Sequence, residues 1–69
     1  MTYKQQIMLN TIKNFIREHG YCPSVRELGE LLGLKSTATI HYGLKQLKKK
    51  GYIDYIPKKS RTIRIINEQ

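Results

Sequence analysis

The chain has 69 residues, with 13 Lys and Arg side chains against five Asp and Glu, and its formal net charge is +8. A chain of this length supports one small domain whose apolar residues are needed for the core, so little room remains for an enzyme pocket. The excess positive charge favours a polyanionic partner, either nucleic acid or an acidic membrane surface. The charge is concentrated in residues 35–69, which carry nine basic and two acidic side chains, while residues 1–34 carry four and three.

Cys22 is the single cysteine of the chain. An internal disulfide and a thiolate metal cluster are therefore excluded, and we expect neither a metal site nor a cofactor. No apolar run approaches the roughly 18 residues that span a bilayer, and residues 1–17 lack the pattern of a signal peptide. These features predict a soluble, reduced, cytoplasmic protein.

The first predicted helix begins at a capping box, because Thr2 is followed three residues later by Gln5. Gly20 is the expected end of this helix. Between them, side chains recur at the spacing of an amphipathic helix: Met8, Ile12, Phe15, Ile16 and His19.

A short second helix is predicted by another capping box, in which Glu27 follows Ser24 by three residues. Gly33 is expected to close it after about two turns. Its apolar stripe is expected to consist of Val25, Leu28, Leu31 and Leu32.

The third predicted helix begins at Ser36, after a connection so short that it allows only a tight turn between two crossing helices. Gly51 is its expected end. Ile40, Leu44 and Leu47 stand at helical spacing and are expected to face the core. Four residues are expected to point the opposite way, with Thr39 and His41 on the flanks: Ala38, Tyr42, Lys45 and Lys49.

Beyond Gly51 the residues favour strands, since 52–56 and 62–66 are rich in Ile, Tyr and Thr. Residues 57–61 form a polar connection with three cations, so a β-hairpin with a basic tip is predicted. The fold class is mainly α with a small β-hairpin, the arrangement of a three-helix winged helix-turn-helix domain. We expect this domain to span residues 1–66, with residues 67–69 as a C-terminal tail.

The start of the third helix has the side chains that a helix needs to approach DNA bases. Short hydroxyl and methyl groups let the backbone enter a major groove, where they can contact base edges and the thymine methyl group. Alternatively, Ser36 serves only as a helix cap and Tyr42 is a surface aromatic. The predicted base-reading residues are Ser36, Ala38, Thr39, His41 and Tyr42.

Cations cluster at the end of this helix and at the hairpin tip, where they could follow the two phosphate rims of one groove. An ordinary solvated face and an ordinary charged turn are the alternatives. The residues predicted to bind phosphate are Ser24, Arg26, Lys35, Lys45, Lys49, Lys58, Lys59 and Arg61. No catalytic residue is predicted, because no base is placed to activate Cys22 and no paired carboxylates or phosphate-binding loop exists.

Several ordered segments resemble the N-terminal DNA-binding domain of LexA, the bacterial SOS-response repressor family. They are the helix start at Thr2, "GYCPSVRELGELLGL", the helix opening at Ser36, "LKQLKKKGYI" and "RTIRII". The resemblance implies that the predicted base-reading residues face operator bases and that the hairpin tip is a wing against the backbone. Ala38 and Tyr42 depart from the groups expected there, and Cys22 stands at a position that is commonly proline.

LexA-family repressors also carry a self-cleaving domain with an Ala-Gly bond and a Ser-Lys pair. The chain has no Ala-Gly dipeptide, so we expect no autoproteolysis and no enzyme activity from it. It is expected to be either part of a longer repressor or a stand-alone regulator that keeps only the DNA reader.

The predicted function is that of a transcriptional repressor domain that binds double-stranded DNA sequence-specifically in the bacterial nucleoid. One short helix reads only about three to five base pairs, so we expect a monomer that pairs on a two-fold symmetric operator or through a missing segment. Two alternatives stay open: a winged-helix protein-interaction module that docks on an acidic partner, and an RNA-binding domain.

Overall fold

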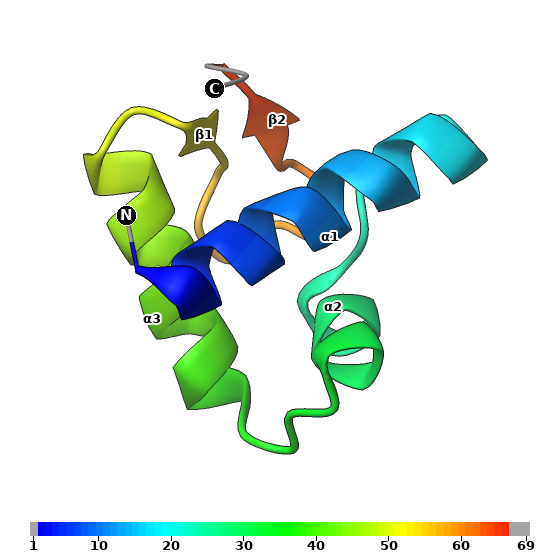
Figure 1. The fold of residues 1–69 in the computed structure, drawn as a ribbon. Coiled ribbons are helices and arrows are strands. Elements are labelled where there is room, and N and C mark those ends of the chain that lie inside the picture. Colours follow the sequence, from blue (N-terminus) through cyan, green and yellow to red (C-terminus); the bar gives the residue numbers. More distant parts are fainter. Residues whose placement is uncertain (1, 67–69) are drawn as a thin grey trace.

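Three helices and a small antiparallel sheet follow one another along the chain (Figure 1). The structure is a computed structural model, and it describes residues 2–66. The predicted tail at 67–69 lies outside the described residues. The elements are α1 (Tyr3–His19), α2 (Val25–Leu32), α3 (Thr37–Lys49), β1 (Ile53–Asp54) and β2 (Arg64–Ile65). This arrangement confirms the predicted fold class.

Both predicted capping boxes are formed. The Thr2 hydroxyl accepts a hydrogen bond from the Gln5 amide at 3.2 Å, and the Gln5 side chain accepts one from the Thr2 amide at 3.3 Å. Ser24 and Glu27 make the same pair of bonds, at 3.2 and 3.0 Å. Each box satisfies two amides that a helix start leaves without partners, which is why α1 and α2 begin where the sequence predicts.

The ends of α3 differ by one or two residues from the prediction. Ser36 occupies the cap position with extended backbone, so the helix begins at Thr37, and the Ser36 hydroxyl makes no capping bond. At the other end Lys50 is the cap and Gly51 follows with a φ of 84°. This left-handed backbone is accessible to glycine without a steric cost, and it lets the chain turn from α3 into β1.

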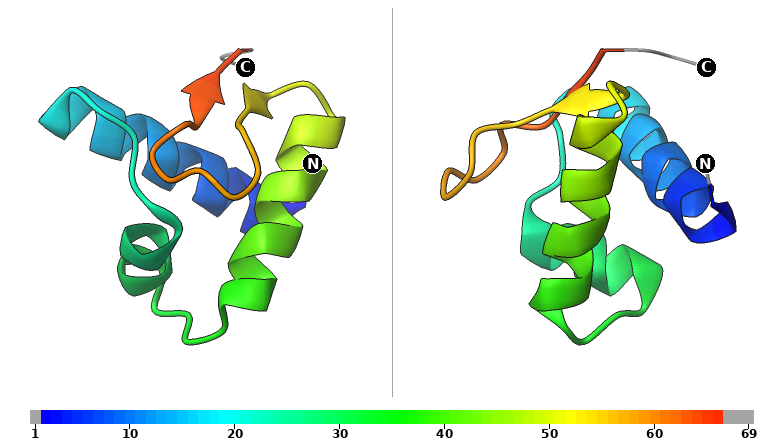
Figure 2. Two further views of the ribbon diagram at one scale, coloured as in Figure 1. Left: turned by 180° about the vertical axis from the view of Figure 1, so that it is seen from behind. Right: turned by 90° about the vertical axis from the view of Figure 1, so that its left-hand side faces the viewer.

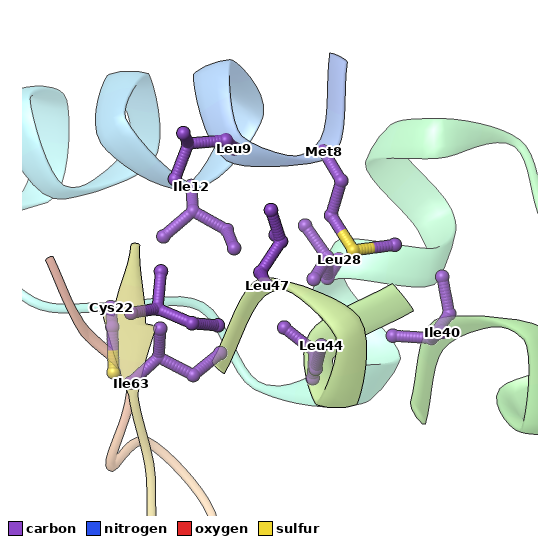
Figure 3. Close-up of a cluster of buried hydrophobic side chains, with 10 residues drawn as sticks. Met8, Leu9, Ile12, Cys22, Leu28, Ile40, Leu44, Leu47 and Ile63 are labelled. Carbon is purple, nitrogen blue, oxygen red and sulfur yellow. The ribbon is translucent and has the colours of Figure 1, made fainter. Parts of the chain in front are cut away.

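The core lies where the three helices and the sheet meet (Figure 3). The inward face of α3 is confirmed, since Ile40, Leu44 and Leu47 are each 1% exposed or less. They pack in one cluster with side chains from the other elements: Met8, Leu9, Ile12, Cys22, Leu28, Ile53 and Ile63. Burial of these side chains holds α3 in a fixed orientation and leaves its opposite face outside.

The buried face of α2 is rotated from the predicted one. Leu31 was expected in the core but is 56% exposed, whereas Gly29 is buried. A Cβ atom at Gly29 would lie 3.2 Å from the carbonyl oxygen of Leu34 and 3.8 Å from Ile40. The absence of a side chain at this position therefore lets the turn after α2 lie close against the helix, and α2 packs with Gly29 inward and Leu31 outward.

The hairpin has shorter strands than predicted. Ile53 pairs with Ile65 and Asp54 with Arg64, and the regular ladder ends there. Beyond it the Thr62 hydroxyl accepts a hydrogen bond from the Ile56 amide at 2.9 Å and lies 3.3 Å from the Ile56 carbonyl oxygen. A side chain thus takes the place of backbone pairing, and residues 55–63 form a loop, called the wing loop below.

The wing loop projects from the sheet on one side of α3. Figure 2 shows α3 standing between this loop and α1. The two flanks of α3 consequently face different surroundings, which matters because α3 and its cap residue Ser36 carry all the predicted base-reading residues. Within residues 2–66 no helix is long and apolar enough to cross a membrane.

Candidate nucleic-acid interface

The predicted base-reading residues share the outer face of α3. All five are exposed, while Ile40 between them is buried. The core contact of Ile40, Leu44 and Leu47 therefore fixes which side of the helix looks outward. This outer set, called the reading face below, consists of Ser36, Ala38, Thr39, His41 and Tyr42.

One flank of the reading face opens on the wing loop. A hollow there is lined by His41 and Leu44 of α3, by residues 23–26 at the start of α2, and by residues 55–63. Segments that lie far apart in the sequence thus meet around His41. Of the predicted phosphate-binding residues, Ser24, Arg26, Lys58, Lys59 and Arg61 line this hollow.

The other flank is more apolar. Thr39 and Tyr42 line a second hollow together with Ile7 and Met8 of α1, with Leu32 at the end of α2 and with Leu34 in the turn that follows. The Tyr42 ring is 66% exposed. His41 and Tyr42, which are adjacent in the sequence, therefore face opposite flanks of α3.

The turn between α2 and α3 brings a third group together. Arg26, Lys35, Ser36 and Thr37 line one hollow, which also contains the carboxylate-bearing Glu30. Lys35 and Arg26 thus lie on the rim next to the first residues of the reading face. The Ser36 hydroxyl, which has no capping role, is available to a ligand as both donor and acceptor.

Most of the predicted phosphate-binding cations have no partner inside the described part of the chain. They are exposed, and their side chains form neither hydrogen bonds nor ion pairs among residues 2–66. Their ammonium and guanidinium groups are therefore available to an external anion. The lysines of this set, called the unpaired lysines below, are Lys35, Lys45, Lys49, Lys58 and Lys59.

Other cations of the same half are held internally. Lys48 Nζ lies 3.0 Å from the Tyr55 carbonyl oxygen and 3.5 Å from a carboxylate oxygen of Asp54. Arg64 binds the other Asp54 oxygen at 3.3 Å. The hydrogen bond from the Tyr55 amide holds the pKa of the Asp54 carboxyl below its ordinary value, and Arg64 and Lys48 lower it further.

Arg61 was predicted to bind phosphate, but its guanidinium also has internal partners. It lies 2.8 Å from a carboxylate oxygen of Glu27 and donates to the Cys22 carbonyl oxygen at 3.2 Å. The hydrogen bond that Arg61 donates to Glu27 is the main cause that holds the pKa of the Glu27 carboxyl below its ordinary value. The sequence gives no local signal for such a pair, because Arg61 and Cys22 are 39 residues apart.

The helix order, the tight turn between α2 and α3 and the cationic hairpin define a winged helix-turn-helix domain. A family model described as the LexA DNA-binding domain matches residues 1–62. The chain belongs to this family.

Within the described residues, no group of His, Cys, Asp and Glu side chains could hold a metal ion.

Full-length relatives show the same similarity. The chain is 50% identical over 68 residues to the LexA repressor of Caldicellulosiruptor saccharolyticus, an alignment that covers 99% of this chain and 34% of that protein. Over 69 residues it is 46% identical to the LexA repressor of Bacillus cytotoxicus and 45% identical to that of Staphylococcus aureus strain Newman. These alignments cover 100% of this chain and 34% and 33% of those proteins. The chain thus spans about a third of the length of these relatives.

Proposed function

We propose that this chain binds double-stranded DNA sequence-specifically and is the DNA-reading part of a transcriptional repressor. The observation that carries the proposal is the reading face of α3, which is exposed, free of long charged side chains and bordered by cations without side-chain partners in the described part of the chain. A helix with such a face fits the major groove, and cations on its borders fit the phosphate rims. The LexA repressors to which the chain is similar support the same function.

The roles of the residues follow from their positions. His41 can donate a hydrogen bond to a guanine edge, and Ala38 and Thr39 can place methyl groups against thymine. Ser36 and Tyr42 complete the base-reading set. Phosphate contacts are assigned to Ser24, Arg26, Lys35, Lys45, Lys49, Lys58 and Lys59, with Arg61 as a further candidate.

Specific binding requires two copies of the chain on a two-fold symmetric operator, because one helix covers only about three to five base pairs. The chain by itself is a monomer that pairs on DNA or through other parts of the protein. In this proposal it contributes no catalytic residue and takes part in the control of SOS genes in the bacterial cytoplasm.

A binding experiment with three nucleic acids tests the proposal. The affinity for duplex DNA is measured from 50 to 300 mM salt beside duplex RNA and single-stranded DNA of the same sequence. With roughly six phosphate contacts, the plot of log K against log salt should have a slope near −5 for duplex DNA. Stronger binding to RNA would contradict the proposal.

A flat salt dependence, or no duplex binding at low salt, would instead favour a module that docks on an acidic protein. Selection of bound oligonucleotides from a random pool then identifies the operator. We expect the selected sequences to contain two inverted half-sites. Recovery of sequences without a common motif would contradict sequence-specific binding.

A further inference from the structure

We infer that Arg61 is a positioning residue, whose guanidinium ties the wing loop to the start of α2 and thereby sets where Lys58 and Lys59 lie relative to the reading face. The inference rests on the proposed function, since it assigns how the DNA-binding surface is held together. It differs from the phosphate contact that the sequence predicts for Arg61, because the guanidinium acts on the protein and not on DNA.

The contacts of Arg61 converge on the segment that leads into α2. Its guanidinium pairs with Glu27 at 2.8 Å, donates to the Cys22 carbonyl oxygen at 3.2 Å and lies 4.9 Å from the centre of the Tyr21 ring. Glu27 belongs to the capping box of α2, and Cys22 lies two residues before that box. A planar guanidinium can satisfy an anion, a carbonyl and an aromatic face together, so one side chain holds the loop by three different contacts.

The backbone of the wing loop indicates that these contacts fix its shape. Arg61 has a φ of 56° and Lys58 a φ of 69°, a left-handed conformation that is uncommon for residues other than glycine and persists where surrounding contacts sustain it. Thr62 binds Ile56 and Lys59 through its hydroxyl. The loop is thus closed on itself by Thr62 and tied to α2 by Arg61, with Lys58 and Lys59 between the two attachments.

Glu27 makes the inference testable because its charge has the wrong sign for DNA binding. Its carboxylate lies near a surface that would face phosphates, so Coulomb forces alone predict that neutralising it strengthens binding. A positioning role predicts the opposite, since loss of the pair releases the wing loop. The direction of the change therefore separates the two effects.

The experiment compares Glu27→Gln, Arg61→Gln and the double variant in duplex DNA binding at fixed salt. Glutamine also suits the third position of a capping box, so Glu27→Gln keeps the start of α2, and circular dichroism at the assay temperature checks that each variant is folded. We expect each single variant to weaken binding about three- to tenfold and the double variant to lose no more than either single. Binding that is unchanged or tighter in Glu27→Gln would overturn the inference.

Arg61→Lys is the conservative comparison, and it keeps the charge. A lysine can bind a phosphate but cannot make three planar contacts, so we expect it to weaken binding about as much as Arg61→Gln. Lys59→Gln is the control for a direct phosphate contact. If Glu27→Gln displaces the wing loop, adding Lys59→Gln should cost less than it does alone, whereas fully additive losses would mean that the wing loop stays in place. If Arg61→Lys binds duplex DNA as tightly as the unmodified chain, residue 61 binds a phosphate directly.

A measurement on the unmodified chain covers the case in which a variant does not fold. Arginine side-chain NMR signals are recorded with and without operator DNA. The Arg61 signal should stay in place while that of exposed Arg26 shifts, and a shift of Arg61 equal to that of Arg26 would overturn the inference. If the unmodified chain does not bind duplex DNA at all, the proposed function fails, whereas normal binding without the Glu27 effect rejects only the positioning role.

Discussion

Two sets of cations lie in the same half of this chain and serve different purposes. Lys48 and Arg61 join the hairpin to α3 and α2 through Asp54 and Glu27, and Arg64 joins the two strands through Asp54. The unpaired lysines surround the reading face and have no side-chain partner among residues 2–66. The positive charge available to a ligand is therefore smaller than the number of Lys and Arg side chains suggests, because acidic side chains of the protein already neutralise part of it.

The largest effect should come from removing three unpaired lysines at once. Lys45, Lys49 and Lys59 border the reading face, and each is assigned one phosphate. Their triple change to Gln should weaken binding to every duplex sequence by roughly 30-fold or more at 50 mM salt, and the salt slope should become shallower by about 2.7. Fluorescence anisotropy over a salt series measures both quantities. An unchanged slope would mean that these lysines do not contact phosphates.

The next largest effect is expected on the preference for the cognate operator over random DNA. His41→Ala removes the polar side chain that faces the wing-loop flank, and it should cost about 1 to 3 kcal/mol on the cognate operator with little change on random DNA. Lys59→Ala is the matched control, since it should weaken both DNAs equally. If His41→Ala also weakens both equally, His41 does not read a base.

A smaller effect on DNA affinity is expected from changing a paired and an unpaired lysine at two adjacent positions. Lys48→Gln and Lys49→Gln change the net charge equally, but Lys48 is bound to Asp54 and Tyr55 while Lys49 has no partner within residues 2–66. Lys49→Gln should weaken DNA binding by roughly three- to fivefold and leave the melting temperature nearly unchanged. Lys48→Gln should show the reverse pattern. Equal losses of affinity for the two variants would contradict the division into paired and unpaired cations.

The features that sequence reasoning located correctly depend on residues close together in the chain. Capping boxes join residues three apart, and the inward face of α3 follows from the regular spacing of Ile40, Leu44 and Leu47. The same reasoning could assign the fold class because the order of such local signals is characteristic. Whether the assigned base-reading residues contact bases stays a prediction.

The features that sequence reasoning missed depend on how the helices and the hairpin pack together. Leu31 is exposed and Gly29 is buried because α2 turns a different side to the core, and Leu9 is fully buried although it lies outside the predicted stripe of α1. The pairing of Arg61 with Glu27 arises only when the hairpin folds back onto α2. No periodicity encodes such contacts, so the sequence could count cations but could not separate the paired from the unpaired ones.

The smallest expected effect is that of acid on the melting temperature. It depends on Glu27 and Asp54, the carboxylates that bind the paired cations. The pKa values of Glu27 and Asp54 are held below their ordinary values of 4.5 and 3.8, by the bond from Arg61 and by the Tyr55 amide respectively. A carboxylate whose folded pKa is depressed stabilises the fold above its unfolded pKa, and this contribution is lost as the pH falls through the folded pKa.

We therefore expect the melting temperature to change little from pH 7 to pH 5 and to fall modestly below about pH 4.5, because exposed pairs are weakened by solvent. In Glu27→Gln the pair is already absent, so its melting temperature should start lower and fall less on acidification. At 1 M salt, where the screening length is about 3 Å, the difference between the two chains should shrink. An acid-induced fall that is the same with and without Glu27 would show that the pair of Arg61 with Glu27 does not stabilise the fold, and would leave the wing loop to be held by Thr62 and by the bond from Arg61 to the Cys22 carbonyl.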